Sequence, residues 1–318
     1  MDRGNRDELM ERQASRSVLL VRPASFGFNP ETAASNAFAS STEEDVAEAV
    51  VREFDALAQR LSAGGVEVLI LEDEPDPPKP DAIFPNNWVS FHADGTMVLY
   101  PMESPTRQRE REPERLAALL RQSGFEVRRT ADLSHHERHG RFLEGTGSLV
   151  IDRRERRAYA NLSPRTDSHI IADFDDRLDY TTLLFDARDR AGRPIYHTNV
   201  LLSLGSRFAV LCTEAVAEEY RAVLIDEIEA SGRTVIKVDF EQLESFACNV
   251  IELESDAGNP VIAISAAAKA SLRPDQLNRL QSFGELLDVP IPTIERVGGG
   301  GIRCMIADIH LPRVSPGS

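Results

Sequence analysis

Three side chains that lie far apart in the sequence could together carry out nucleophilic catalysis. Cys304 offers a thiol, His197 an imidazole and Glu144 a carboxylate. A thiolate that attacks an amidino or ureido carbon requires a nucleophile, a proton shuttle and a group that orients the shuttle. Each residue alone also has a structural explanation, because buried cysteines, core histidines and acidic turn residues are common in proteins.

Four consecutive glycines, Gly298 to Gly301, precede Cys304 in the segment VGGGGIRCM. Such a run costs conformational entropy on folding, which indicates a local requirement for it. A phosphate-binding loop would continue with Lys and Ser or Thr, whereas this segment continues with Ile302 and Arg303. We therefore predict a flexible loop that delivers the Cys304 thiol to a ligand.

The other candidate residues occupy three further segments. Glu144 lies in FLEGTGSLV, where an acidic residue and two glycines precede an expected strand. His197 lies in IYHTNVLL, which we expect to be an apolar strand. Asn86 and Asn87 lie in PDAIFPNNW beside the only tryptophan, at the end of a loop. Glycines let the backbone approach a ligand closely, but glycine and asparagine are also common in plain turns, so both explanations stay open here.

A histidine-rich stretch suggests metal binding without fitting a known pattern. His135, His136 and His139 surround Glu137, but the spacing is one residue short of the helical zinc pattern, because Gly140 stands where the next histidine would be. The sequence contains no second set of Cys or His residues at ligand spacing. We expect neither a metal nor a cofactor.

The chain that must position these residues repeats one pattern: an amphipathic helix, a turn with glycine or a small polar residue, and a short strand. The clearest helix is predicted to begin at Ser41, with Glu44 completing a capping box, and to end at Gly64 before a strand over 66–71. Further copies turn near residues 124, 178, 232 and 284, the first of them followed by an expected strand over 125–128. Five units of roughly 50 to 60 residues indicate supersecondary structure repeated around a centre.

Composition limits what the protein can bind. The 318 residues are 42% hydrophobic and 28% charged, as in a globular protein, and a net charge of −16 opposes binding to nucleic acid or to anionic membranes. Three cysteines without regular spacing favour a reducing compartment, so we expect a cytoplasmic protein. We expect a loose tail over residues 1–16 and a single domain over 17–318. A homodimer stays open, because dimers are the commonest oligomers.

The order of the motifs PDAIFPNNW, FLEGTG, IYHTNV and GGGGIRCM resembles that of the guanidine-modifying, or pentein, superfamily. This superfamily contains arginine deiminases, dimethylarginine hydrolases and amidinotransferases. The resemblance is closest to an amidinotransferase-like group that includes citrulline ureidases, and it covers residues 17 to about 313. It implies a five-bladed α/β propeller with pseudo-fivefold symmetry, in agreement with the five units of the repeat.

The resemblance also implies roles for individual residues. Cys304 would be the nucleophile, His197 the general acid and base, and Glu144 the carboxylate that holds His197. The substrate would be a small ureido or guanidino amino acid whose α-carboxylate is bound by an arginine. The residues expected to contact this substrate are Asn87, Asn199, Asp81, Asn86, Phe84, Gly301 and either Arg107 or Arg109.

Two departures from the family pattern bear on the substrate. Guanidinium-cleaving relatives carry aspartates at the positions of Asn87 and Asn199. An aspartate suits a cationic guanidinium, whereas an asparagine can both donate to and accept from a neutral ureido group. Burying the charge of arginine between two amides would cost several kcal/mol. We therefore favour hydrolysis of citrulline to ornithine, ammonia and carbon dioxide.

Two alternatives remain open. An arginine deiminase or a dimethylarginine hydrolase would act on a guanidino group and release citrulline. A non-catalytic member of the superfamily would use the propeller as a binding surface, but it would have no use for the set of Cys304, His197 and Glu144. The negative net charge also opposes binding to ribosomal RNA.

Overall fold

A computed structural model describes residues 11–42 and 46–314. Over these residues the chain forms five small sheets of three strands each. The strands are β1 (Ser17–Arg22), β2 (Glu67–Glu72), β3 (Val89–Phe91), β4 (Thr96–Leu99), β5 (Arg129–Asp132), β6 (Val150–Asp152), β7 (Arg157–Asn161), β8 (Thr181–Phe185), β9 (Leu202–Leu204), β10 (Phe208–Cys212), β11 (Thr234–Val238), β12 (Ile251–Glu254), β13 (Pro260–Ser265), β14 (Glu285–Val289) and β15 (Ala307–Ile309).

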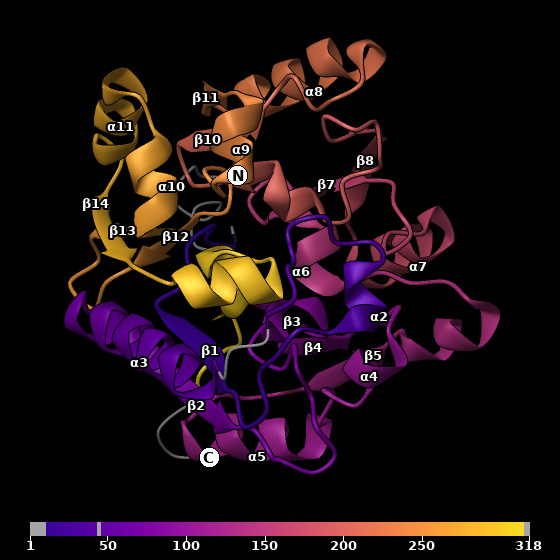
Figure 1. Ribbon diagram of the computed structural model, residues 1–318. Coiled ribbons are helices and arrows are strands. Elements are labelled where there is room, and N and C mark those ends of the chain that lie inside the picture. The colour runs from indigo at the N-terminus through magenta and orange to yellow at the C-terminus, as the bar shows by residue number, and fades with distance from the viewer. Residues whose placement is uncertain (1–10, 43–45, 315–318) are drawn as a thin grey trace, which may run out of the picture.

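Helices and short helical turns connect the strands. The α-helices are α2 (Pro30–Ala33), α3 (Ala47–Ala63), α4 (Pro105–Gln108), α5 (Pro113–Gln122), α6 (Gly145–Ser148), α7 (Ser168–Leu178), α8 (Glu218–Ala230), α9 (Phe240–Glu244), α10 (Ala266–Ser271) and α11 (Pro274–Gln281). The remaining helical turns are η1 (Pro85–Asn87), η2 (Ser134–His139), η3 (Thr198–Val200), the π-helical η4 (Ile294–Gly298) and η5 (Ile302–Met305). The longer helices α3, α5, α7, α8 and α11 lie at the periphery, and the sheets surround the centre (Figure 1).

All five sheets share one topology, which confirms the predicted α/β propeller. In each sheet the middle strand pairs antiparallel with an inner strand and parallel with an outer strand that follows a helix. The first sheet takes its inner strand, β15, from the other end of the chain, with Ser17 opposite Ile309. This pairing joins the two ends of the described chain in one blade and so closes the ring of blades.

The helix of the first blade starts later than predicted. Helix α3 buries Val50, Phe54, Leu57 and Leu61 in one apolar face, as the three- and four-residue spacing indicates. However, α3 begins at Ala47 with no side-chain cap, not at Ser41. The preceding segment is instead anchored on the propeller, where Ser40 N–H donates to Arg296 O at 2.8 Å. Glu44, the second half of the predicted capping box, lies outside the described residues.

Most turns that follow the helices agree with the predicted repeat, whereas one of the predicted strands does not. Gly65, Gly124 and Gly232 adopt left-handed φ angles of 81°, 79° and 83°, and Asp179 does so in the third blade with φ 55°. The strand expected over 125–128 is wrong, because β5 begins at Arg129. Residues 125 and 126 pair with the C-terminal segment instead, through a bridge to Arg313 and a bond to Pro312 O.

Residues 11–16 are packed against the propeller and do not form a loose tail. Gln13 donates to Ile151 O at 2.9 Å, and Arg12 and Arg16 both pair with Glu254. Ser15 is buried. Residues 1–10, the rest of the predicted tail, lie outside the described residues.

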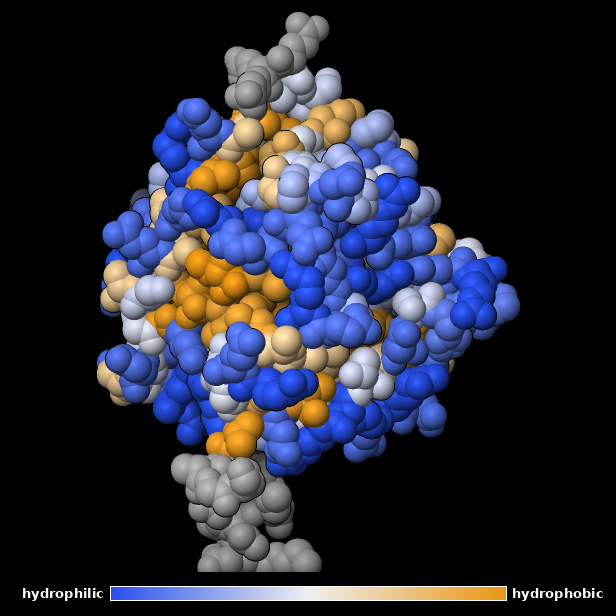
Figure 2. Space-filling model, turned by 90° about the horizontal axis from the view of Figure 1, so that it is seen from below, coloured by the Kyte–Doolittle hydropathy of each residue, from blue (hydrophilic) through white to orange (hydrophobic). Residues whose placement is uncertain are grey.

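The surface is consistent with a strongly charged protein. The face seen in Figure 2 is covered mostly by hydrophilic residues, with one larger apolar area between them. Among the described residues, the large apolar side chains that are clearly exposed are Ile70, Val223 and Val314. None of the helices formed by these residues is both long and apolar enough to span a membrane.

Candidate active site

The candidate residues lie on the short turns that lead into the inner strands, which we call the inner turns. These are η1 before β3, α6 before β6, η3 before β9, residues 247–249 before β12, and η5 before β15. Because every inner strand starts near the centre of the propeller, the five inner turns meet there. The fold thereby gathers side chains that are far apart in the sequence, as the predicted site requires.

Cys304 lies on η5 and is buried, with 3% of its surface exposed. Its Sγ receives two amide N–H groups, from Asn249 Nδ2 at 3.3 Å and from Asn199 Nδ2 at 3.5 Å. Burial raises the pKa of the Cys304 thiol, whereas the Asn249 amide and the nearby Arg303 charge oppose this shift. The sulfur is therefore desolvated but surrounded by groups that favour its thiolate form.

The glycine run before Cys304 is tightly packed, so the prediction of a flexible loop is wrong. A Cβ atom on Gly298 would lie 2.8 Å from the Phe84 ring, and one on Gly301 would lie 2.7 Å from Asn249 Oδ1. Residues 298–301 are all buried. The glycines are required because neighbouring side chains occupy the space that a Cβ would need, not because the loop must move.

His197 and Glu144 form a buried pair. His197 Nε2 lies 2.8 Å from Glu144 Oε2, and the exposed fractions of the two side chains are 2% and 0%. His197 has extended backbone angles and precedes η3, so it is not part of a strand as predicted; β9 begins only at Leu202. Its position at the end of an inner turn directs the imidazole toward Glu144 on the neighbouring blade.

The charges around this pair fix its protonation. Burial alone would raise the pKa of Glu144, but the Arg165 charge and the hydrogen bond to His197 outweigh burial and hold it well below its usual range. Burial lowers the pKa of His197 to about 4, although Glu144 opposes this. At neutral pH the carboxylate is therefore ionised and the imidazole neutral. Because the Nε2–H donates to Glu144, Nδ1 is the ring nitrogen left to exchange protons.

Asn87 is oriented by a buried arginine. Arg107 Nη1 donates to Asn87 Oδ1 at 2.8 Å, and Glu110 holds the same guanidinium through contacts of 2.9 and 3.0 Å. A guanidinium only donates hydrogen bonds, so the oxygen of the Asn87 amide must face Arg107. The Asn87 Nδ2 is then turned away, and it is buried without a hydrogen-bond partner among the described residues.

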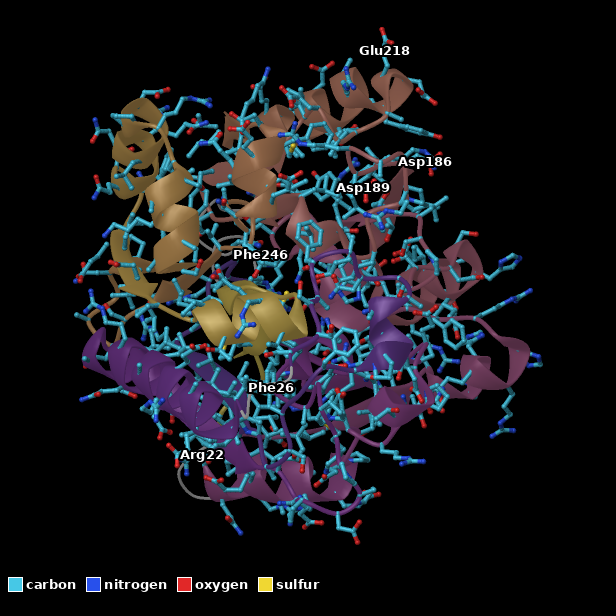
Figure 3. All side chains as sticks on the ribbon, viewed as in Figure 1. Arg22, Phe26, Asp186, Asp189, Glu218 and Phe246 are labelled. Atoms are coloured by element: carbon cyan, nitrogen blue, oxygen red, sulfur yellow. The ribbon has the colours of Figure 1, made fainter. Side chains whose placement is uncertain are left out.

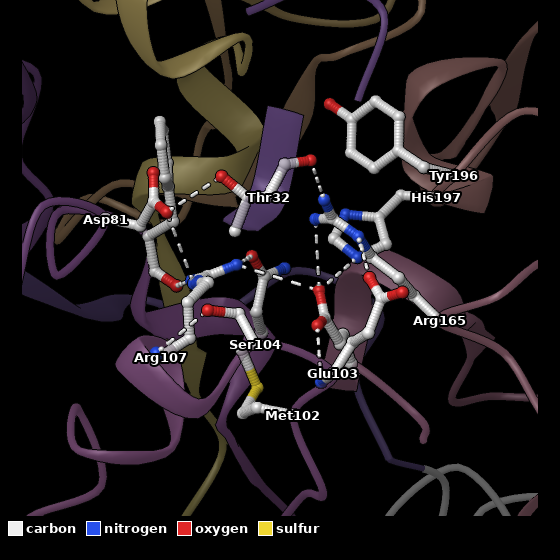
Figure 4. Close-up of polar contacts among 12 residues, drawn as sticks. Thr32, Asp81, Met102, Glu103, Ser104, Arg107, Arg165, Tyr196 and His197 are labelled. Atoms are coloured by element: carbon white, nitrogen blue, oxygen red, sulfur yellow. Dashed lines mark hydrogen bonds and ion pairs between the residues drawn. The ribbon is translucent and has the colours of Figure 1, made fainter. Parts of the chain in front are cut away.

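These groups surround a small pocket. Its lining residues include the segment around α2 as well as the propeller centre: Thr32, Asn36, Asp81, Phe84, Asn87, Arg107, Arg165, Tyr196, His197, Gly298, Gly299, Gly300 and Cys304. Figure 4 shows Thr32, Arg107, Arg165 and His197 with the polar contacts that join them. The pocket presents the sulfur, the imidazole and an amide together.

Several predicted contact residues lie elsewhere. Arg109 is exposed and does not line the pocket, unlike Arg107. Asn86 is fully buried, and both polar atoms of its side chain are unpaired among the described residues. Its backbone carbonyl accepts a hydrogen bond from Thr146 Oγ1 at 3.3 Å. Asn199 and Gly301 are also absent from the lining residues, because Asn199 lies against the sulfur and Gly301 against Asn249.

Two buried residues of the site were missed in the sequence analysis. Arg165 donates to Thr32 O at 2.7 Å, lies 3.4 Å from Glu144 and stacks over Tyr196. No motif marks Arg165, since a buried arginine cannot be told from an exposed one by sequence. Asn249 could have been found, because its Asn-Val pair repeats the pair formed by Asn199 and Val200 in the preceding blade.

The histidine-rich stretch has partners other than a metal. Ligand atoms of His135, His136 and Asp173 lie within 4.8 Å of one another. However, His136 Nε2 pairs with Asp173 at 2.9 Å, and Asp173 pairs in turn with Arg177 at 2.6 Å. These contacts satisfy the Asp173 carboxylate as an ion pair. The expectation that the protein holds no metal stays a prediction.

Comparisons with known proteins place this geometry in context. A family model described as eukaryotic N,N-dimethylarginine dimethylhydrolase matches residues 22–311. ArgZ, an arginine dihydrolase from the ornithine–ammonia cycle in cyanobacteria, superposes with a TM-score of 0.71 at 18% identity, over 94% of this chain and 41% of its own. The chain thus spans less than half of full-length ArgZ.

Two further structures match over nearly their whole length. The N-terminal domain of ArgZ bound to its substrate has a TM-score of 0.71 and 18% identity, covering 93% of this chain and 99% of its own. Dimethylarginine hydrolase from Pseudomonas aeruginosa in complex with citrulline has a TM-score of 0.63 and 13% identity, covering 94% and 99%. At these identities the likeness concerns the fold. The chain has no match among curated proteins.

Proposed function

The chain belongs to the family described as eukaryotic N,N-dimethylarginine dimethylhydrolase, within the guanidine-modifying pentein superfamily, and on this premise we propose that it is a cysteine hydrolase that cleaves a C–N bond of citrulline. The superfamily resemblance of the four motifs is thereby confirmed. Cys304 is the nucleophile, His197 the proton shuttle and Glu144 the group that orients it. We further propose that the enzyme works in the cytoplasm, where its three unpaired cysteines would stay reduced.

The unpaired amide nitrogen of Asn87 is the observation that favours a ureido substrate. Arg107 occupies the amide oxygen, so Asn87 can offer the pocket only an N–H donor. A ureido group has a carbonyl oxygen that accepts this donor, whereas a guanidinium has donors alone. A guanidinium would leave the buried N–H unpaired, which costs about 1–3 kcal/mol.

The nearby acidic side chains give a guanidinium little compensation. Asp81 lines the pocket, and its Oδ2 accepts from Asn29 at 2.8 Å and from Thr32 at 3.2 Å. Glu144 is held by His197 and Arg165. A cationic substrate would therefore lose its hydration with only the Oδ1 of Asp81 to pair with, and this favours the neutral ureido group.

The residues support a two-step hydrolysis. His197 Nδ1 takes the thiol proton, and Cys304 Sγ adds to the ureido carbon of citrulline. His197 then returns the proton to the departing δ-nitrogen, so that ornithine leaves and a carbamoyl thioester remains on Cys304. In the second step His197 removes a proton from water, whose oxygen attacks the same carbon and breaks the C–S bond. The released carbamate decomposes to ammonia and carbon dioxide, consuming one water per citrulline.

A guanidino substrate is the second candidate, because the names of the family and of the similar structures favour it. The family is named for dimethylarginine, and ArgZ is named an arginine dihydrolase. AgrE, another similar structure at 16% identity and TM-score 0.72, was solved in complex with L-arginine and covers 94% of this chain and 41% of its own. Cys304 would then attack the guanidino carbon, with His197 and Glu144 in the same roles. The reaction would release ammonia or dimethylamine and leave citrulline.

Product analysis separates these candidates. The purified protein is incubated separately with citrulline, arginine and N,N-dimethylarginine, and ornithine, citrulline and ammonia are quantified. We expect ornithine from citrulline, and no product with the Cys304→Ala variant. Citrulline that accumulates from arginine or dimethylarginine would overturn the ureido preference. Inactivity toward all three substrates would favour the non-catalytic alternative.

A further inference from the structure

Asn249 lies against the nucleophile although none of the four motifs contains it. It belongs to the inner turn before β12, and its exposed fraction is 1%. Its Nδ2 donates to Cys304 Sγ at 3.3 Å and to the backbone oxygen of Asn199 at 3.0 Å. The Asn249 amide nitrogen thus donates both to the sulfur and to the backbone of Asn199, whose side chain also contacts the sulfur.

The surrounding backbone fixes this side chain. Asn249 N–H donates to Phe246 O at 2.8 Å, and Phe246 itself has a left-handed φ of 59°, which is unfavourable for a bulky residue. Phe246 lies near the centre of the propeller (Figure 3). On the other side, the absence of a Cβ at Gly301 leaves room for Asn249 Oδ1. Such constraints are expected where a side chain must keep one orientation.

The pseudo-symmetry of the fold assigns Asn249 to the set of functional positions. The other four inner turns supply Asn87, Glu144, Cys304 and the pair of His197 and Asn199. Asn249 is the corresponding residue of the fifth blade, and its Asn-Val pair matches Asn199 and Val200 of the fourth. The inner turn of this blade therefore supplies a side chain to the site, as the inner turns of the other four blades do.

We propose that Asn249 is a catalytic residue that donates a hydrogen bond to the Cys304 thiolate and, through the backbone oxygen of Asn199, holds the second amide donor in place. This inference rests on the proposed function, in which Cys304 is the nucleophile. Hydrogen bonds to the charged form of an acid stabilise that form. Because an amide carries no net charge, Asn249 stabilises the thiolate without placing a cation in a pocket that binds a neutral ureido group.

Other charged groups also face the sulfur and set the background against which Asn249 acts. Arg303 lies on the same turn and favours the thiolate. Tyr196, His197 and Arg107 line the same pocket. None of them is changed by a substitution at Asn249, so a shift in thiol reactivity in an Asn249 variant reports the lost amide.

The test measures the thiol itself and needs no substrate. The rate of Cys304 alkylation by iodoacetamide is followed from pH 5 to pH 10 for the wild type, Asn249→Ala and Asn249→Asp. Peptide mass spectrometry identifies the labelled cysteine, because Cys212 and Cys248 are also unpaired. Asn249→Asp keeps the size of the side chain, so the test survives if Asn249→Ala does not fold. Cys248→Ala, a buried neighbour in the same turn, is the matched control.

We expect the alkylation profile of Asn249→Ala to shift to higher pH by about one unit, which lowers the rate at pH 7 about tenfold. Asn249→Asp should shift it at least as far, and Cys248→Ala should not shift it. Unchanged profiles in folded Asn249 variants would overturn the proposal and leave a structural role only. If the profiles shift but citrulline is not hydrolysed, the role of Asn249 stands and the substrate assignment fails.

Discussion

Two buried polar clusters, one around Cys304 on η5 and one around Asp308 on β15, differ in how completely their polar atoms are paired. The inner-turn cluster contains Cys304, His197, Glu144, Asn87 and Asn249. The Asp308 cluster contains Asp308, Arg153, Arg303, His310 and Glu11. Among the described residues, the inner-turn cluster leaves Asn87 Nδ2 and Asn249 Oδ1 without partners.

In the Asp308 cluster, by contrast, each charge has an opposite charge within reach. Asp308 pairs with Arg153 at 3.0 Å, with His310 at 2.9 Å and with Arg303 at 3.4 Å, and Glu11 also pairs with Arg153. Burying a polar atom without a partner costs free energy, so it persists where something outside the chain pairs with it. Unpaired buried atoms also occur elsewhere in the described structure, for example Tyr159 Oη and Ser203 Oγ. The two clusters nevertheless differ: the inner-turn cluster keeps unused hydrogen-bonding capacity beside the pocket, whereas the charges of the Asp308 cluster are paired with one another.

The largest effect should follow from changing the free donor of the inner-turn cluster. Asn87→Asp replaces the N–H that faces the pocket by a carboxylate oxygen, while Arg107 still has an oxygen to bind. We expect the ratio of kcat/KM for citrulline to that for arginine to fall about a thousandfold, because the variant repels a carbonyl and attracts a guanidinium. Steady-state kinetics with both substrates measures this ratio.

Asn259→Asp is the matched control, because it adds the same charge at an exposed position. It should leave the ratio unchanged. If Asn87→Asp also leaves the ratio unchanged, the Asn87 amide does not select the substrate. The unpaired nitrogen of Asn87 would then no longer distinguish a functional cluster from a structural one.

The second effect concerns stability. Asp308→Asn removes one of the two carboxylates that pair with the buried Arg153 and the carboxylate that pairs with the largely buried Arg303 in the described structure. We expect the free energy of unfolding to fall by about 3 kcal/mol, because Arg303 loses its anion and Arg153 keeps Glu11 alone. The value of kcat/KM per folded molecule should change by less than about threefold, in keeping with a structural role. Urea unfolding followed by fluorescence measures the first quantity.

An exposed ion pair provides the control. Asp55 pairs with Arg22 at 2.8 Å, and its side chain is 52% exposed. Asp55→Asn should therefore change the free energy of unfolding by less than about 0.5 kcal/mol. Equal losses in Asp55→Asn and Asp308→Asn would remove the distinction between a paired buried cluster and an ordinary surface contact.

Sequence reasoning predicted the blades, which the structure confirms, and it singled out the proposed reacting groups, because both depend on local signals. Glycine turns such as Gly65 and Gly232 follow from the backbone geometry of a helix end, and left-handed glycines of this kind occur in three of the five blades. Cys304, His197 and Glu144 belong to motifs that are specific only in combination and in their order along the chain. The family resemblance implied that the three residues meet, although His197 was expected within a strand.

The remaining features depend on contacts between blades, which local patterns do not encode. The rigidity of the glycine run follows from Phe84 and Asn249, which come from other blades. The start of α3 depends on the contact of Ser40 with Arg296. The orientation of Asn87 follows from Arg107, whose burial no sequence pattern announces. Only Asn249 left a usable signal, since its Asn-Val pair repeats that of Asn199.

The smallest effect defines the edge of the inner-turn cluster. Arg107 was the first candidate for binding the substrate carboxylate and Arg109 the second, and Arg107 is buried in the pocket wall whereas Arg109 is exposed outside it. Arg109→Ala should change KM for citrulline by less than about twofold and the free energy of unfolding by less than about 0.5 kcal/mol. Kinetics and urea unfolding of this variant check both values. An increase of KM by about tenfold would mean that Arg109 reaches the bound carboxylate, and the cluster would then extend to the surface of the protein.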